Sequence, residues 1–281
     1  MNEKGLGKHL QAMRRSAGLT QQALCQKAGL SFSTVAKIER GAIKAPSIFT
    51  VADIAAALQV SLDELIGQTD KSKPEKQRQR SKSGVQFVYF DINGTLVRSY
   101  HRAFTRLAET TNQPTDQVET AFWHYNDQVN RGDITMAEFN RALADRLHTK
   151  QKIDWQSYYM QEVEVMPQMQ ELLRWVGARY GVGLLTNIMP GLVKLMLRGG
   201  LLPDVDYDAV IDSSEVRTIK PEPKIYQLAA ERADCPASQL LLIDDTRANL
   251  TAAEKAGWHV IWFDGFRPQE SGHNIRAALE N

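Results

Sequence analysis

Residues 87–96 read Phe-Val-Tyr-Phe-Asp-Ile-Asn-Gly-Thr-Leu, and this stretch decides the fold. Its four consecutive apolar or aromatic residues favour a buried strand, which delivers Asp91 into a turn that contains Gly94. A carboxylate at the end of a buried strand is costly unless it binds a cation or takes part in chemistry. By itself the motif would also suit an ordinary strand that ends in an aspartate turn.

Three later stretches place polar side chains in comparable positions. Residues 181–187 (Gly-Val-Gly-Leu-Leu-Thr-Asn) predict a second strand, and residues 240–245 (Leu-Leu-Leu-Ile-Asp-Asp) a third that ends in paired carboxylates. Residues 219–223 (Ile-Lys-Pro-Glu-Pro) put Lys220 in a loop that opens a helix. In a parallel sheet these strand ends and this loop meet at the carboxyl edge, where open α/β sheets bind ligands. A carboxylate nucleophile, a hydroxyl, a cation and two more carboxylates are the groups that phosphoryl transfer requires.

In this order, the four motifs resemble those of the haloacid dehalogenase (HAD) superfamily of phosphohydrolases, from about Val85 to Phe263. Residues 243–249 (Ile-Asp-Asp-Thr-Arg-Ala-Asn) are similar to the branch with an IDDxxxN fourth motif. That branch includes hexose-phosphate phosphatases and the N-terminal phosphatase domains of soluble epoxide hydrolases. The resemblance implies a Rossmann-like α/β core over residues 85–281, with a helical cap at about residues 97–165. The alternation of helical and strand patterns after Met166 agrees with a parallel sheet covered by helices.

The resemblance also implies roles for the acidic residues. Asp91 would attack phosphorus in line and form an aspartyl-phosphate. Mg²⁺ would be held by an oxygen of Asp91, the backbone carbonyl of Asn93, and the Asp244 and Asp245 pair. In the same way, Thr186 and Asn187 would form hydrogen bonds to the phosphoryl group.

The resemblance also implies roles for Lys220 and Asn249. Lys220 would bind the phosphoryl group and neutralise the charge that develops on it during transfer. Asn249 would brace the fourth motif. The expected ligand is a phosphorylated small molecule, with a sugar phosphate as one candidate.

One residue departs from the family pattern. The usual sequence DxDGT reads DxNGT here, because position 93 is asparagine. The residue at this position normally protonates the leaving group and then activates water, and an amide cannot exchange a proton at neutral pH. Loss of general acid–base catalysis typically lowers a rate by about 10²–10⁴-fold. Some working members of the superfamily lack this aspartate, so the sequence leaves open whether the site turns over.

Residues 1–67 predict a compact set of short helices. Thr20 is a good N-cap for a helix over residues 21–28, Gly29 ends it, and a further helix follows from about Ser31 to Arg40. Two capped helices about eleven residues apart, separated by a glycine turn, are typical of a helix-turn-helix.

This region resembles the XRE, or phage-repressor, family of DNA-binding domains, through residues 19–24 (Leu-Thr-Gln-Gln-Ala-Leu) and 34–41 (Thr-Val-Ala-Lys-Ile-Glu-Arg-Gly). The resemblance implies double-stranded DNA as a partner and a homodimer that binds two half-sites. It places four residues on the groove-facing side of the third helix, namely Phe32, Ser33, Thr34 and Lys37. Gln21 would lie near the backbone and the first base pair, and Arg14, Lys44 and Ser47 are candidate phosphate contacts. Solvation of these side chains at an ordinary surface is the competing interpretation.

Charge is divided unequally along the chain. Residues 1–84 carry 14 Lys and Arg against 7 Asp and Glu, whereas the remainder carries 20 against 26. Residues 68–84 contain no apolar residue and predict a flexible basic linker. The two cysteines, Cys25 and Cys235, lie outside any CxxC or His-rich pattern, which argues against a zinc site. The N-terminus lacks an apolar signal and no long apolar window occurs, so we expect a cytoplasmic protein without a membrane partner.

Three functional hypotheses follow. In the first, the chain is a transcriptional regulator whose HAD-like domain binds, and slowly hydrolyses, a phosphorylated small molecule. In the second, it is an active Mg²⁺-dependent phosphatase with an accessory DNA-binding domain. In the third, both domains are scaffolds for protein contacts. Intact Asp91, Thr186, Lys220 and Asp245 argue against pure scaffolding, whereas Asn93 argues against ordinary turnover.

Overall fold

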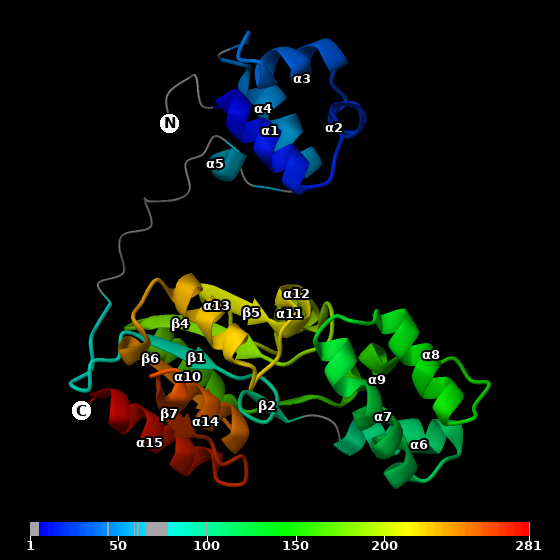
Figure 1. Cartoon of the computed structure of the whole chain (residues 1–281), viewed down its shortest axis with the longest axis vertical. Coiled ribbons are helices and arrows are strands. Elements are labelled where there is room, and N and C mark those ends of the chain that lie inside the picture. Colours follow the sequence, from blue (N-terminus) through cyan, green and yellow to red (C-terminus); the bar gives the residue numbers. More distant parts are fainter. Residues whose placement is uncertain are drawn as a thin grey trace. The chain divides into compact units, whose positions relative to one another are not determined.

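The computed structural model describes residues 6–43, 45–58, 60, 62–65, 78–98 and 101–280. The chain separates into two compact units, Met1–Lys76 and Gln77–Asn281. Figure 1 shows the helices and strands of each unit. Lys44 and most of the predicted linker lie outside the described residues.

The first unit is a bundle of short helices whose ends follow local sequence signals. The helices are α1 (Leu6–Ser16), α2 (Gln21–Ala28), α3 (Phe32–Glu39), α4 (Ile48–Leu58) and α5 (Leu62–Leu65). The Thr20 side chain accepts a hydrogen bond from the backbone of Ala23, and Ser31 does the same for Thr34, so α2 and α3 begin at capped residues. Gly29 ends α2 with φ of 65°, a conformation that favours glycine. The helix-turn-helix predicted from the sequence is therefore present.

The second unit is built on one parallel sheet of five strands in the order β5-β4-β1-β6-β7. Its strands are β1 (Phe87–Phe90), β4 (Gly181–Thr186), β5 (Ala209–Asp212), β6 (Leu240–Asp244) and β7 (His259–Trp262). The central strand β1 is buried along its whole length, as its apolar sequence requires. Its neighbours on the two sides are β4 and β6, the strands that the sequence predicted to end in functional side chains.

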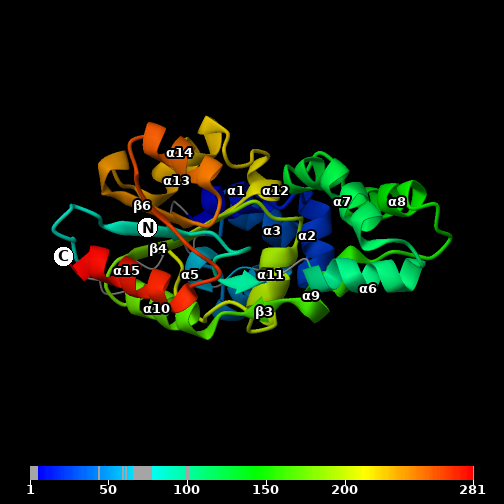
Figure 2. The same ribbon diagram turned by 90° about the horizontal axis from the view of Figure 1, so that it is seen from below.

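Helices cover both faces of this sheet. One face packs against α10 (Pro167–Gly177), α11 (Leu192–Arg198) and α15 (Pro268–Glu280), and the other against α13 (Pro223–Ala233) and α14 (Arg247–Lys255). Figure 2 shows the pair α13 and α14 on the opposite side of the sheet from α10 and α15. The short α12 (Ser213–Val216) and a 3₁₀ turn (Ala237–Gln239) complete the connections. The result is the three-layer α/β architecture predicted from the sequence.

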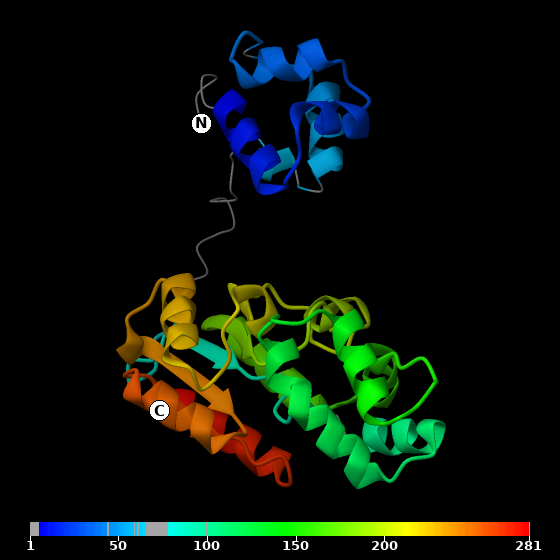
Figure 3. The same cartoon turned by 45° about the vertical axis from the view of Figure 1, so that its right-hand side comes forward.

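Four further helices form a lobe beside the core. They are α6 (His101–Thr111), α7 (Thr115–Asn130), α8 (Met136–Arg146) and α9 (Trp155–Glu162). A small antiparallel pair, β2 (Val97–Arg98) and β3 (Glu164–Val165), connects the lobe to the core at both of its ends. Buried aromatic rings, including Phe104, Phe122 and Trp155, pack in its interior. Figure 3 shows this helical lobe standing beside the sheet, where the sequence placed a cap.

Candidate active site and nucleic-acid interface

The predicted site residues meet at the carboxyl edge of the sheet. Phe90 is in register with Leu184 on one side and with Ile243 on the other. Asp91 therefore leaves β1 beside the ends of β4 and β6, and its backbone N–H donates to the Ile243 carbonyl at 2.9 Å. The parallel pairing of the strands is the reason that motifs almost a hundred residues apart come together here.

Lys220 forms the electrostatic centre of this edge. Its Nζ donates to Oδ1 of Asp91 at 2.8 Å and to Oδ2 of Asp244 at 2.5 Å. All three side chains are almost completely buried. Burial by itself would lower the pKa of Lys220, but the nearby Asp244 and Asp91 outweigh it, and the pKa is raised. Lys220 is therefore a permanent cation next to the predicted nucleophile.

Burial has the opposite effect on Asp91. Loss of solvent raises the pKa of the Asp91 carboxyl to about 7, because attraction to Lys220 only partly offsets burial while Asp244 and Asp245 repel its charge. The pKa of Asp245 is also raised, again mainly by burial. A further positive charge near these oxygens would stabilise their ionised forms.

The three carboxylates fit a hard divalent cation. One oxygen from each of Asp91, Asp244 and Asp245 can be chosen so that all lie within 4.8 Å of one another. Carboxylate oxygens are the ligands that Mg²⁺ prefers. Gly94 is needed for this arrangement, because a Cβ at that position would lie 2.0 Å from Oδ2 of Asp245. The structure therefore brings together the three carboxylates that were predicted as metal ligands.

Two asparagines hold this arrangement in place. Nδ2 of Asn249 donates to both carboxylate oxygens of Asp244 at 3.1 Å, the bracing role expected of it. Asn187 makes contacts other than the predicted one to phosphate. Its Oδ1 accepts from the backbone N–H of Lys220 at 2.7 Å, and its Nδ2 donates to the Lys220 carbonyl at 2.8 Å. These two bonds make its side chain a support for the lysine loop and leave one N–H of the amide for the predicted phosphoryl contact, which stays a prediction.

The hydroxyl of Thr186 is available for a ligand. Thr186 ends β4 and is fully buried, and its Oγ1 has no hydrogen-bond partner among the described residues. A buried hydroxyl without a partner is unfavourable in a folded protein, and a functional site is one explanation for it. This observation agrees with the predicted role of Thr186 in binding a phosphoryl group.

Asn93, which replaces the usual aspartate, is hydrogen-bonded to a residue of the helical lobe. The hydroxyl of Tyr159, on the lobe helix α9, donates to Oδ1 of Asn93 at 2.5 Å. Tyr159 is only 1% exposed. Sequence reasoning missed this residue, because nothing in its local pattern distinguishes it from its neighbour Tyr158.

Other contacts join the lobe to the core around the same edge. Nη2 of Arg131, which follows α7, lies 2.5 Å from Oε1 of Glu222, two residues after Lys220. The Ser213 hydroxyl donates to the Asn130 carbonyl at 2.6 Å, and Nε2 of Gln156 donates to the Pro190 carbonyl at 2.7 Å. The lobe is thus held against the carboxyl edge by polar contacts from α7 and α9.

In the first unit, α3 presents the residues predicted to face a DNA groove. Phe32 is 56% exposed, and Ser33 and Lys37 are also exposed on this helix. Thr34 is half-buried, and its hydroxyl shares a 2.8 Å hydrogen bond with that of Ser31. Phe32 and Lys37 are therefore exposed for contact with another molecule, while the hydroxyls of Ser33 and Thr34 also form hydrogen bonds to the capping Ser31.

Arg14 and Gln21 depart from their predicted roles. Arg14 is buried, and its guanidinium pairs with Glu39 at 2.6 and 3.0 Å while donating to the Leu19 carbonyl at 2.7 Å. Nε2 of Gln21 donates to the same Glu39 carboxylate at 2.7 Å. Arg14 therefore joins helices inside the unit and does not offer its charge to a DNA phosphate. The half-buried Gln21 combines a place at the start of α2 with this internal contact.

Comparisons with known proteins assign each unit to a family. Residues 10–65 match the helix-turn-helix family, and residues 85–257 match the haloacid dehalogenase-like hydrolases. Pyrophosphatase PpaX from Bacillus cereus strain Q1 is 23% identical over 186 residues, which cover 62% of this chain and 80% of that relative. Mouse acyl-CoA dehydrogenase family member 10 is 25% identical over 203 residues, 68% of this chain. The match covers only 19% of the mouse protein's length.

Solved structures show the same fold in the second unit. A HAD family enzyme from Bacteroides thetaiotaomicron, crystallised with magnesium and inorganic phosphate, has a TM-score of 0.57 at 19% identity and covers 65% of this chain and 95% of its own. A predicted HAD-like hydrolase from Porphyromonas gingivalis has a TM-score of 0.57 at 18% identity, covering 68% of this chain and 98% of its own. The chain belongs to the haloacid dehalogenase-like hydrolases and carries a helix-turn-helix domain ahead of its hydrolase domain.

Proposed function

We propose that this chain is a DNA-binding transcriptional regulator whose hydrolase domain binds a phosphorylated small molecule and hydrolyses it slowly. The proposal depends on which residues are present at the carboxyl edge of the sheet. Asp91, Lys220 and Asp245 are assembled there, yet the adjacent acid–base position is an asparagine held by Tyr159. Such a site retains the means to bind a phosphoryl group and lacks a side chain that exchanges a proton.

The chemistry follows from the residues in place. An oxygen of Asp91 forms a bond to phosphorus while the bond from phosphorus to the leaving oxygen breaks, which gives an aspartyl-phosphate. Lys220 and the Thr186 hydroxyl stabilise the transferring group. With Asn93 in place, the leaving oxygen takes its proton from water, so both this step and hydrolysis of the acyl-phosphate are slow.

The acidic cluster would hold Mg²⁺ during this reaction. Asp91, Asp244 and Asp245 supply carboxylate oxygens, and the backbone carbonyl of Asn93 is a fourth candidate donor. When bound, the cation would neutralise charge on the carboxylates and on the phosphoryl oxygens. The magnesium and phosphate bound by the Bacteroides enzyme support this choice of metal and ligand class.

The helix-turn-helix unit supplies the DNA-binding half of the proposal. Phe32, Ser33 and Lys37 lie exposed on α3, the second helix of the motif, which reads the major groove in proteins of this architecture. Lys37 can donate to guanine, and Phe32 can contact a thymine methyl group. Binding as a homodimer to two half-sites, in the cytoplasm, belongs to the same proposal.

The alternative is an active phosphatase in which the DNA-binding unit is accessory. It is favoured by the relatives named pyrophosphatase and by the otherwise complete site. A sugar phosphate and inorganic pyrophosphate are both candidate substrates in this case.

A comparison of three forms tests the two functions. Hydrolysis of sugar phosphates, pyrophosphate and an aryl phosphate would be measured with Mg²⁺ for the native chain, Asn93→Asp and Asp91→Ala. The regulator proposal expects a native rate about 10²–10⁴-fold below that of Asn93→Asp, and no activity in Asp91→Ala. Turnover by the native chain at the rate of Asn93→Asp would contradict it and favour the phosphatase. DNA affinity would then be measured with and without the best ligand, because a sensor requires the ligand to favour one of two states.

A further inference from the structure

The contact between Tyr159 and Asn93 joins the helical lobe to the loop that carries the predicted nucleophile. Tyr159 belongs to α9 of the helical lobe, and Asn93 to the loop that carries Asp91 and Gly94. They are 66 residues apart in sequence, and the hydrogen bond between them is short, at 2.5 Å. The position that would perform acid–base chemistry is thus directly connected to the lobe.

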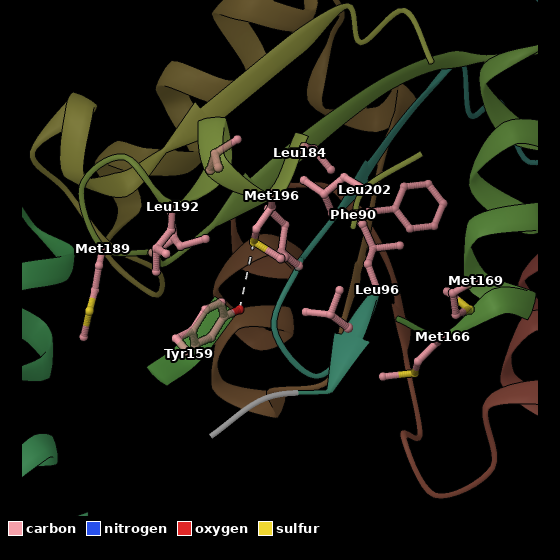
Figure 4. Close-up of a cluster of buried hydrophobic side chains, with 14 of the residues drawn as sticks. Phe90, Leu96, Tyr159, Met166, Met169, Leu184, Met189, Leu192, Met196 and Leu202 are labelled. Atoms are coloured by element: carbon pink, nitrogen blue, oxygen red, sulfur yellow. Dashed lines mark hydrogen bonds between the residues drawn. The ribbon is translucent and has the colours of Figure 1, made fainter. Parts of the chain in front are cut away.

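The surroundings of Tyr159 make this hydrogen bond important. Figure 4 shows its ring among the side chains of Met189, Leu192 and Met196, all of them buried core residues. Its hydroxyl also lies 4.0 Å from the sulfur of Met196, which is a weak acceptor. A hydroxyl in such apolar surroundings is costly unless it is hydrogen-bonded, so the pair is stabilised relative to a separated lobe and core.

The same bond fixes the amide of Asn93. Because Oδ1 accepts from Tyr159, the orientation of the side chain about its last torsion is determined, and the NH₂ group is directed away from the tyrosine hydroxyl. Gln156, one turn earlier on α9, anchors the same helix to the Pro190 carbonyl. Helix α9 therefore approaches the site as a fixed element.

We propose that Tyr159 is a positioning residue that orients the Asn93 amide for the phosphorylated ligand and holds the lobe closed over it. This inference rests on the proposed ligand-binding function and assigns the lobe a part in it. Closure of the lobe and orientation of Asn93 are coupled, because this hydrogen bond contributes to both. Ligand bound at Asp91 and Lys220 is retained for as long as that bond persists.

Binding of inorganic phosphate in the presence of Mg²⁺ tests the proposal in the full chain. Tyr159→Phe keeps the ring and removes the hydroxyl, and phosphate affinity should fall about tenfold. The matched control is Tyr158→Phe, since the Tyr158 hydroxyl makes no hydrogen bond within the described part of the chain. Its affinity should equal that of the native chain. An unchanged affinity in Tyr159→Phe would overturn the proposal.

A double-mutant cycle separates positioning from general loosening of the site. In an Asn93→Ala background, Tyr159→Phe should change phosphate affinity by less than about twofold, because the residue on which it acts is already absent. In an Asn93→Asp background, which keeps an acceptor oxygen, the effect should return. The affinity for Mg²⁺ alone should be unchanged in Tyr159→Phe. A tenfold loss that persists with Asn93→Ala, or an equal loss of Mg²⁺ affinity, would contradict the assignment.

A ligand-free measurement keeps this inference distinct from the proposed function. Amide hydrogen exchange of Trp155–Glu162 should be faster in both Tyr159→Phe and Asn93→Ala than in the native chain, and unchanged in Tyr158→Phe. Suppose that the native chain binds no phosphate while exchange follows this pattern. In that case the proposed function is wrong, and the role of the Tyr159–Asn93 contact in holding the lobe is supported. If exchange in α9 is the same in all four proteins, the Tyr159–Asn93 contact does not hold the lobe, whatever the outcome with phosphate.

Discussion

Nζ of Lys220 lies 2.8 Å from Oδ1 of Asp91, and both side chains are buried at the carboxyl edge of the sheet. The same ammonium group also contacts Asp244 at 2.5 Å, so one cation pairs with two of the three carboxylates of the site. In the absence of a metal, this arrangement makes Lys220 a structural residue as well as the proposed contact for a phosphoryl group.

Removal of this cation should destabilise the hydrolase unit. Lys220→Met leaves Asp91 and Asp244 buried without their partner, a change that typically costs about 3–5 kcal/mol. Urea unfolding without divalent metal, followed by tryptophan fluorescence, would measure it, since all five tryptophans lie after residue 122. The control is Lys194→Met, which breaks the exposed pair with Glu215 and should cost less than about 1 kcal/mol. Equal stability of the two variants would contradict the prediction.

Binding of Mg²⁺ should release a proton at mildly acidic pH. Burial raises the pKa of Asp91 to about 7 in the metal-free protein, and a metal ligand must be ionised. Protons are released and not taken up, because below pH 7 the Asp91 carboxyl holds a proton that the cation displaces. Above pH 7 the carboxyl is already ionised and has no proton to release. Calorimetry in buffers of different ionisation enthalpy should therefore detect nearly one proton per cation at pH 6 and far less at pH 8. The release at pH 6 should fall strongly in Asp91→Asn, which leaves Asp245 as the carboxyl with a raised pKa among the proposed ligands.

Gly94 should be required for ligand binding, whereas Gly257, which has the same backbone conformation, should not. Gly94 and Gly257 both have φ of 85°, so alanine is strained at either position. A Cβ at Gly94 would lie 2.0 Å from Oδ2 of Asp245, whereas at Gly257 its nearest neighbour would be the Ala237 side chain at 3.5 Å.

Titration with Mg²⁺ and inorganic phosphate would compare the two variants. Both should lose roughly 1–3 kcal/mol of stability, and only Gly94→Ala should lose at least tenfold in affinity. Similar affinities in Gly94→Ala and Gly257→Ala would show that Asp245 does not contribute to the site in the position described.

The sequence was sufficient for the parts of the site that depend on strand ends. Asp91, Lys220 and Asp245 follow local patterns that a parallel sheet must bring to one edge, so their meeting could be predicted without coordinates. The contacts of Tyr159 with Asn93 and of Arg131 with Glu222 could not, because they depend on how the helical lobe docks. No local pattern encodes that docking.

The same reasoning explains why Arg14 and Asn187 make contacts that the sequence did not predict. Arg14 was a candidate phosphate contact, but its partner Glu39 lies 25 residues away on another helix, so no local pattern indicated the buried pair. The resemblance to the haloacid dehalogenase superfamily implied that Asn187 would bind the phosphoryl group. In the structure its amide pairs with the backbone of Lys220, a pairing set by the conformation of a loop 33 residues later.

The ion pair of Glu39 should make the helix-turn-helix unit sensitive to acid. Burial would raise the pKa of Glu39, but hydrogen bonds from Arg14 and Gln21 outweigh it, and the pKa is lowered. A lowered folded-state pKa contributes stability that is present above the unfolded value of about 4.5 and is lost as pH falls through the folded value. Amide protection factors in α1–α3 of the full chain, corrected for the intrinsic exchange rate at each pH, should therefore fall below about pH 4.5, and less so in Glu39→Gln. Asp53→Asn, at an exposed site on α4, should match the native profile.

Lys37 and Arg14 should differ in their effect on DNA binding. After a binding sequence has been selected from random duplexes, Lys37→Ala should lose about 1–3 kcal/mol of affinity and relax specificity at one base pair, while the unit stays folded. The exposed Arg232→Ala, in the hydrolase unit, serves as the control and should bind like the native chain. Equal binding by Lys37→Ala and the native chain would remove Lys37 from the interface.

Arg14 requires a variant that removes its charge without leaving Glu39 buried and unpaired. Arg14→Met combined with Glu39→Leu replaces the whole buried pair by apolar side chains, a change that is often neutral for stability. Each phosphate contact that is lost lowers the slope of log affinity against log salt by about 1. Since the Arg14 guanidinium is held inside the unit, the double variant should keep the native slope. A slope lower by about 1 in the folded double variant would mean that the pair opens on DNA and that Arg14 contacts a phosphate after all.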